Sequence, residues 1–429
     1  MGHGRFVNLA AALLLAIMMV LSTMLIHANG TSDVEMYLTW GSLAQRHGLA
    51  AGYRMMVDNW PETVLGGNRA AGGGEAPPLG FAWLYVVCAL ADIVGLSHFL
   101  ALKIALLIFG FGSTVMLGLF SRSIALAAAF QGSIVVSASG LGYMDVACAP
   151  LLIAALWAIR DKRPLTGFVL FLLSVLLKWQ PLIIAPFLLA HMLEISDLRS
   201  LRRALVNPVT WKLAVALLVT VSCVGAVFGD APLGAFHWAL LHPFLSGNTL
   251  NIPWVVTFVA RMLFSPNFAI TDEIAYVMSP PLSLLPFKLI FFALYGLAAR
   301  RFLGVERTFG NCLLFSVVGV VTYGVWNSAV HENHWFIALV PAFVLVGTTR
   351  DPAARWIAVL VAVMFNVNLF VFYGVTGQEV IARTVGIDLS VILALIYVAI
   401  WLLLFCHAWS VRPAKTPVAS LSRVRARLT

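Results

Sequence analysis

Long apolar runs separated by short polar segments form the pattern of this sequence. The first run extends from Phe6 to Ile26, and similar runs recur up to a polar C-terminal tail. About 20 consecutive apolar residues are enough to cross the hydrocarbon layer of a membrane as a helix. No small-x-small cleavage site follows the first run, so we expect it to remain as an anchor. The pattern predicts an all-α polytopic membrane protein with about 12 transmembrane helices.

Two longer polar stretches interrupt the apolar pattern. We expect residues 27–97 to form a first outer loop that carries juxtamembrane helices, and residues 230–282 to form a second long outer loop. Residues 1–411 would then be a single transmembrane domain, and residues 412–429 a basic cytoplasmic tail. The composition agrees, because 61% of the residues are hydrophobic and only 10% are charged. A soluble domain has about 25% charged residues, so soluble enzymes are excluded.

The net charge of +9 indicates topology. Lys and Arg number 27 against 18 Asp and Glu, and the basic residues cluster between apolar runs. Cytoplasmic loops carry an excess of Lys and Arg, so these clusters predict the inner side and leave an acid-rich outer side. The clusters are Arg160–Arg163, Arg199–Arg203, Arg300 with Arg301 and Arg307, Arg350 with Arg355, and the tail. No nucleic-acid partner is expected. The many Ala and Arg residues are typical of a high-GC bacterium, which would place the chain in the inner (plasma) membrane.

This sidedness raises a parity problem between two acidic loops. Asp33 and Asp145 should both lie outside, so an even number of crossings must separate them. Three apolar runs lie between them: Leu79–Leu96, Phe99–Phe120 and Ser123–Ser139. We expect the first not to cross fully, because it follows Pro77 and Pro78 and contains Asp92.

Two acidic motifs could carry chemistry. Asp33 and Glu35 follow the first apolar run, and Asp145 follows a glycine-containing turn. Carboxylates in such places can act as a base or bind a cation. They can also be helix caps, with Ser32 or Asp33 capping a helix over Val34–Arg46 and Asp145 capping one that starts at Val146. Both alternatives stay open.

A third motif combines two histidines with an acid. His331, Glu332 and His334 occur together between two apolar runs. Zinc is disfavoured because the spacing differs from the H-E-x-x-H pattern of metalloproteases. Histidine beside a carboxylate suits phosphate or sugar hydroxyls, and a plain interfacial loop is the alternative.

The remaining candidates are cations, amides and an aromatic ring. Lys178 and Gln180 lie at the end of an apolar run, where the lysine could face a lipid-linked phosphate or reach the membrane interface by snorkelling. Asn248, Asn251 and Trp254 in the second outer loop suit sugar contacts or turns and interfacial belts. Arg54 in the first outer loop is a further cationic candidate.

The order of these motifs resembles the GT-C superfamily of integral-membrane glycosyltransferases, over about residues 31 to 336. The features that resemble it are the acidic motif in the first outer loop, a Pro-Pro-Leu entry, a Gly-x-x-Asp turn, a Lys-x-Gln-Pro segment, an Asn-rich stretch ending in Trp and a His-Glu motif. Their residues are Asp33 with Glu35, Pro77 to Leu79, Gly142 with Asp145, Lys178 to Pro181, Asn248 to Trp254, and His331 to His334.

The resemblance implies an inverting transfer of a hexose, such as mannose, from a polyprenyl-phosphate sugar to a glycan or glycolipid acceptor on the outer face. Asp33 would be the general base, assisted by Glu35 and Asp145. Lys178, His331 and His334 would stabilise the departing phosphate. Other donor contacts would come from Arg54, Gln180, Glu332, Asn248, Asn251 and Trp254. Membrane lipids are further expected partners.

Cofactor use and function both have alternatives. If a divalent cation (Mg²⁺ or Mn²⁺) is bound, Asp33 and Asp145 would hold it. Glu35 replaces the second Asp of a D-x-D motif, which disfavours a metal. A secondary transporter of a small solute or lipid-linked sugar would fit 12 helices equally well, and an acyltransferase or ligase of envelope glycans is a third possibility. Transporters, however, tend to place their polar groups at the middle of the membrane.

Overall fold

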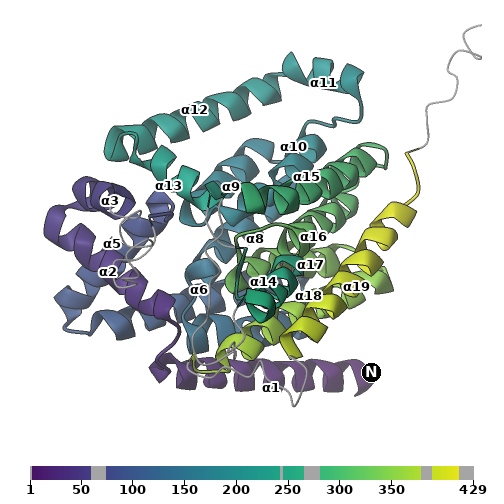
Figure 1. Cartoon of the computed structure of the whole chain (residues 1–429). Helices are drawn as coiled ribbons and strands as arrows, with labels where there is room; N and C mark the ends of the chain where they lie inside the picture. The colour runs from purple at the N-terminus through teal and green to yellow at the C-terminus, as the bar shows by residue number, and fades with distance from the viewer. Residues whose placement is uncertain (1, 59–73, 242–244, 265–280, 378–388, 415–429) are drawn as a thin grey trace, which may run out of the picture.

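The chain is almost entirely helical (Figure 1). The computed structural model describes residues 2–58, 74–241, 245–264, 281–377 and 389–414. In these ranges the two strands β1 (Ser246–Gly247) and β2 (Val330–His331) form the only sheet, which is parallel, with Ser246 opposite Val330 and Gly247 opposite His331. The all-α prediction is confirmed for the described residues.

The N-terminal part consists of one apolar helix, a group of shorter helices and two further apolar helices. α2 packs against both α3 and α5. The bounds are α1 (Gly2–Met24), a 3₁₀ turn η1 (Leu25–His27), α2 (Ser32–His47), α3 (Leu49–Asp58), α5 (Pro78–Val94), α6 (His98–Ser121) and α7 (Ile124–Val135). The segment predicted to be the first outer loop therefore contains α2, α3 and α5.

The middle of the chain alternates short helices with irregular turns. A π-helical turn η3 (Val136–Leu141) follows α7 directly, and 3₁₀ turns precede α8 and α10. The bounds are η4 (Met144–Cys148), α8 (Ala149–Arg160), α9 (Pro164–Leu177), η5 (Gln180–Ile184), α10 (Ala185–Met192), α11 (Leu198–Leu205), α12 (Pro208–Phe228) and α13 (Ala231–Leu241).

The C-terminal part contains longer helices around another 3₁₀ turn. α16 packs against α15, α17 and α19. The bounds are α14 (Ile252–Phe264), α15 (Pro281–Leu303), α16 (Phe309–Trp326), η6 (Glu332–Trp335), α17 (Phe336–Thr348), α18 (Pro352–Tyr373) and α19 (Leu389–Ser410). Residues 265–280 of the second predicted outer loop and most of the basic tail lie outside the described residues, as do residues 59–73 of the first loop.

Seven helices of the described chain are long and apolar enough to cross a membrane: α1, α6, α7 with η3, α12, α16, α18 and α19. Six of them carry exposed apolar side chains, for example Val215 (57% exposed) and Leu218 (66%) on α12, whereas α16 is largely buried. Large exposed apolar surfaces of this kind mark contact with lipid or with another protein. The helices thus agree with a membrane protein, while the total of about 12 crossings stays a prediction.

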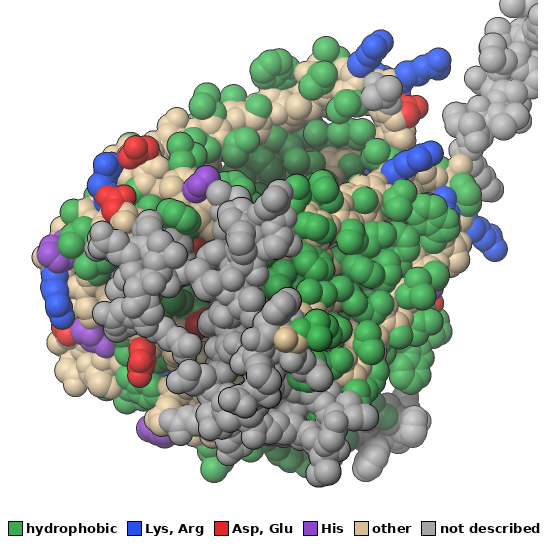
Figure 2. All heavy atoms as spheres, in the orientation of Figure 1, with side chains coloured by type: hydrophobic (Ala, Val, Ile, Leu, Met, Phe, Trp, Pro, Cys, Tyr) green, Lys and Arg blue, Asp and Glu red, His purple; other side chains and the backbone are tan. Residues whose placement is uncertain are grey.

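Helices of the bundle run between a polar end and a basic end. α8 and α17 begin within four residues of Asp145 and His334, respectively. α8 ends at Arg160, and α17 ends two residues before Arg350. α9 and α18 run in the opposite direction. α9 begins after Arg163 and ends before Lys178, and α18 begins after Arg350 and ends at Tyr373. Lys and Arg side chains gather where α11 lies and where α15 ends (Figure 2).

The prediction that Leu79–Leu96 does not cross the membrane concerns α5. This helix has 17 residues, which corresponds to about 25 Å and is shorter than a usual span. Asp92 in its last turn accepts hydrogen bonds from Gln45 at 2.6 Å and pairs with His98 at 2.8 Å, in exposed surroundings. Polar contacts at the C-terminal end of α5 are compatible with a helix that does not cross the membrane fully, which stays a prediction.

The sidedness can be tested by cysteine labelling in intact cells. A cysteine at the exposed Glu35 of α2 should react with a membrane-impermeant maleimide added from outside, because we expect this end to face outward. A cysteine at the exposed Arg199 of α11 should react only after permeabilisation. The reverse pattern of labelling would invert the topology.

Candidate functional site

Two segments that carry acidic residues are docked directly on each other. The backbone N–H of Thr31 donates to the carbonyl of Leu141 at 3.1 Å. Gly142 has a φ of +78°, and a Cβ there would come within 2.5 Å of the Val34 side chain. Only glycine fits this left-handed position without strain. The start of α2 therefore lies against the turn that leads to Asp145.

A buried lysine supports the same turn from α6. Lys103 is 0% exposed, and its ammonium donates to the carbonyls of Ser139 at 2.6 Å and Gly140 at 2.8 Å. These carbonyls lie at the end of the π-helical turn η3, where helix geometry no longer supplies donors. The lysine thus satisfies backbone groups that would otherwise be buried without partners.

Asp33 lies in the first turn of α2 and is half-buried. The hydroxyl of Tyr37, one turn later, donates to its Oδ2 at 3.2 Å. Burial raises the pKa of Asp33 to about 6, while the positive charge of Lys178 opposes the increase. Thr31 occupies the N-cap position without a side-chain hydrogen bond, so capping by Ser32 or Asp33 is not observed. Glu35 is exposed on the same helix.

Asp145 and Lys178 form a buried ion pair. Lys178 Nζ lies 3.5 Å from Asp145 Oδ2, with side-chain exposures of 14% and 0%. Burial raises the pKa of Asp145, and Lys178 opposes this. Burial lowers the pKa of Lys178, but the charges of Asp145 and Asp33 outweigh it, so the net pKa is raised. Asp145 caps no helix, since Cys148 is the N-cap of α8. The lysine is buried against a carboxylate instead of snorkelling to an interface.

Two tyrosines hold the carboxyl group of Glu332. The hydroxyl of Tyr143 donates to Glu332 Oε1 at 2.5 Å, and that of Tyr373 donates to the same oxygen at 3.2 Å. The side-chain amide of Asn248 in turn donates to the Tyr373 hydroxyl at 2.7 Å. Burial is the main cause that raises the pKa of Glu332 to about 8, with Asp33 adding to it. Glu332 is therefore largely neutral at pH 7.

His334 is held at both ring nitrogens. Gln180 Nε2 lies 2.7 Å from its Nε2, and the hydroxyl of Tyr323 lies 3.0 Å from its Nδ1. His331 contributes its backbone N–H to Nδ1 at 3.3 Å, and its own ring lies 5.3 Å from that of His334. The predicted Lys-x-Gln-Pro and His-Glu motifs are thus brought together.

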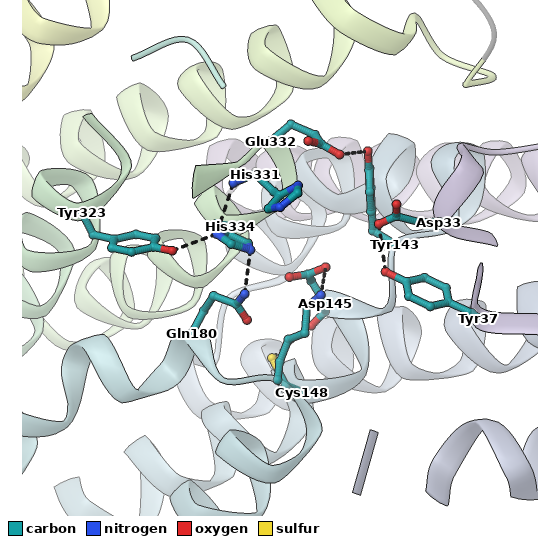
Figure 3. A network of polar contacts seen from close by, with 11 residues as sticks. Asp33, Tyr37, Tyr143, Asp145, Cys148, Gln180, Tyr323, His331, Glu332 and His334 are labelled. Carbon is teal, nitrogen blue, oxygen red and sulfur yellow. Dashed lines mark hydrogen bonds and ion pairs between the residues drawn. The ribbon is translucent and has the colours of Figure 1, made fainter. Parts of the chain in front are cut away.

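Figure 3 shows how these groups lie relative to one another. Asp33, Asp145, Glu332, His331 and His334 lie near one another, with Glu332 directed toward Tyr143 and His334 toward Gln180 and Tyr323. They come from α2, the turn before α8, and the β2–η6 segment. The structure therefore brings together candidates whose positions in the sequence differ by up to about 300 residues.

The other predicted donor contacts have internal partners. Asn251 accepts from the Trp254 backbone N–H at 2.8 Å and donates to the Gly324 carbonyl at 3.2 Å. Trp254 donates from its indole nitrogen to Ser390 at 2.8 Å. All of these atoms are buried, so the stretch acts as a support for the site. Arg54 pairs with Asp230 at 2.9 Å on the surface.

The donor set does not fit a divalent cation at Asp33 and Asp145. The ammonium of Lys178 lies against Asp145 and partly offsets the rise in the pKa of both carboxyls that burial causes. A bound divalent cation would supply the same positive charge, so Lys178 already fills that role. Glu35, the second acid of the motif, is exposed on the helix surface. No group of three or more His, Cys, Asp or Glu residues suited to a metal occurs within the described ranges.

Sequence reasoning missed the residues that tune these candidates. They are Tyr37, Lys103, Tyr143, Tyr323 and Tyr373. Tyr37 and Tyr143 lie within the two acidic segments but have no expected role there. Tyr37 could have been found from its i, i+4 spacing to Asp33, which places both on one helical face. Lys103 could have been found as a charge inside an apolar run, because such residues are functional or paired by default.

No family model matches the chain, and no curated protein matches it.

The support from Lys103 can be tested by its replacement with methionine. Lys103→Met should lower the stability by about 2–5 kcal/mol, because two charged hydrogen bonds are lost and two carbonyls stay buried. Thermal unfolding of the purified protein in detergent measures this, with the exposed Lys162→Met as a matched control. Equal melting temperatures for the two variants would show that the contact is dispensable.

Proposed function

We propose that the protein is a glycosyltransferase of GT-C type, with about 12 crossings, in the inner membrane of a bacterium. It would transfer a hexose from a polyprenyl-phosphate sugar to a glycan or glycolipid acceptor at the outer face. One observation carries the proposal: two carboxylates, a lysine and two histidines meet at the polar end of a bundle whose other end is basic. A lipid-linked phosphate could be reached there from the bilayer.

Asp33 is the best base among the three carboxyl groups. Asp145 is fully buried and already neutralised by Lys178. Glu332 has a pKa of about 8 and is largely protonated at pH 7. Asp33 is partly accessible, and its pKa of about 6 leaves it mostly ionised near neutral pH. General bases work best when their pKa lies near the working pH.

The proposed reaction is a single displacement. Asp33 accepts the proton of the acceptor hydroxyl, and the hydroxyl oxygen forms a bond to the anomeric carbon. The bond between that carbon and the phosphate oxygen breaks, and the polyprenyl phosphate leaves with the electron pair. Lys178, His331 and His334 stabilise its negative charge, so positioning and charge neutralisation supply most of the rate. Asp145 acts as a positioning residue by holding Lys178.

Replacing Asp33 tests the assignment of the base. In reconstituted membranes, transfer of radiolabelled sugar from polyprenyl-phosphate donors should fall at least ~100-fold in Asp33→Asn, a typical general-base contribution. The matched control Glu35→Gln changes an exposed acid two residues away on the same helix and should stay within a few-fold of the native rate.

Two results would speak against this proposal. Full activity in Asp33→Asn, with normal expression, would remove Asp33 as the base. Movement of a labelled sugar or lipid-linked sugar across the membrane without formation of a glycosylated product would favour the alternative of a secondary transporter.

The acid side of the pH profile should depend on Lys178. Transfer should decline below about pH 6, as Asp33 becomes protonated. Because the positive charge of Lys178 lowers the pKa of Asp33, Lys178→Met should raise that pKa and move the acid limb to higher pH. Initial rates measured from pH 5 to 9 for both proteins check this, and an unchanged acid limb would contradict the coupling.

A further inference from the structure

A basic pocket lies at the end of the bundle opposite to the site. It has a volume of about 200 Å³ and is open to the surroundings. Its lining comes from the starts of α9 and α12: Arg163, Pro164, Leu165, Thr166, Val209 and Lys212. Two cations and a hydroxyl therefore face one small space, and no acidic residue lines it.

The backbone reinforces the positive potential of this pocket. α9 begins at Pro164 and α12 at Pro208, so the N-terminal ends of two helices meet there. The N-terminal end of a helix carries a partial positive charge that favours anions. α9 has no side-chain cap, whereas the side chain of Asn207 already accepts from the Val209 N–H at the start of α12. The two basic side chains and the positive ends of both helix dipoles thus favour the same kind of ligand, an anion such as a phosphate.

An apolar surface continues from the pocket along α12. Only 11% of the apolar stretch of this helix is buried, although it packs against α9. Figure 2 shows the molecule hollowed beneath α12, with hydrophobic side chains in the hollow. Among the exposed residues of α12, Trp211 and Val215 lie within one turn of Lys212. A ligand with an anionic head and apolar chains would match both features.

We propose that this pocket binds the headgroup of an anionic phospholipid, with its acyl chains against α12. Arg163 and Lys212 would bind the phosphate, and the hydroxyl of Thr166 could donate a hydrogen bond to it. Basic pockets between membrane helices on the cytoplasmic side are suited to such headgroups. The site is separate from the proposed donor site, since the 14 residues of α9 place about 21 Å between its two ends.

Native mass spectrometry of the full chain in detergent tests the proposal. Titration with phosphatidylglycerol should show a bound lipid, with weaker binding of phosphatidylcholine. Neutralising both cations in Arg163→Gln/Lys212→Gln should weaken phosphatidylglycerol binding roughly 30-fold, since each basic residue near an anionic lipid contributes about fivefold. The control Arg199→Gln/Arg202→Gln removes two charges from α11, outside the pocket, and should bind as the native protein does.

A second variant keeps the charge and fills the space. Thr166→Trp should weaken phosphatidylglycerol binding without changing the melting temperature, because the residue is exposed at the pocket. Equal binding by the pocket and control variants would overturn the site. Equal binding of phosphatidylcholine would overturn the selection by charge, and displacement by glycerol phosphate alone would show that a free anion, not a lipid, is the ligand.

Discussion

The buried ion pair between Asp145 and Lys178 is the interaction on which the site depends. It joins the turn before α8 to the end of α9, two places where helices of the bundle are interrupted. Burying a charge is costly unless a partner compensates it, and removal of one partner of such a pair typically costs about 3–5 kcal/mol. Each residue therefore fixes the place of the other. The charge of Lys178 then reaches Asp33 as well and keeps that carboxyl ionisable near neutral pH.

The interruptions are possible because protein groups satisfy the exposed backbone. Irregular backbone at membrane depth is tolerated only where it is buried in protein or lines a polar cavity. Here Lys103 binds the carbonyls of Ser139 and Gly140, and the Thr31 N–H binds that of Leu141. The groups that stabilise the broken helix are thus also those that draw α2, and with it Asp33, to the site.

Three carboxyl groups in one region have three different states, and their surroundings explain the difference. Asp145 is neutralised by a cation, Glu332 is held by two tyrosine hydroxyls and is largely protonated at pH 7, and Asp33 has a pKa of about 6 beside a single tyrosine. Environments that separate the pKa values of neighbouring acids are typical of catalytic sites. The difference between these carboxyl groups follows from burial and partners, since the side chains are nearly the same.

The sequence by itself determined that the chain is helical and rich in apolar spans, because hydropathy is a local property of the chain. It also determined which polar residues sit at helix ends, including Asp33, Asp145, Lys178 and His334. Only the tertiary structure decided their partners. The tyrosines that hold Glu332 lie 189 and 41 residues away from it, and Lys103 acts on carbonyls 36 and 37 residues away. It also showed that Asn251 and Trp254 are bonded within the protein. Such contacts depend on which helices pack together, and the hydropathy pattern along the chain does not specify this.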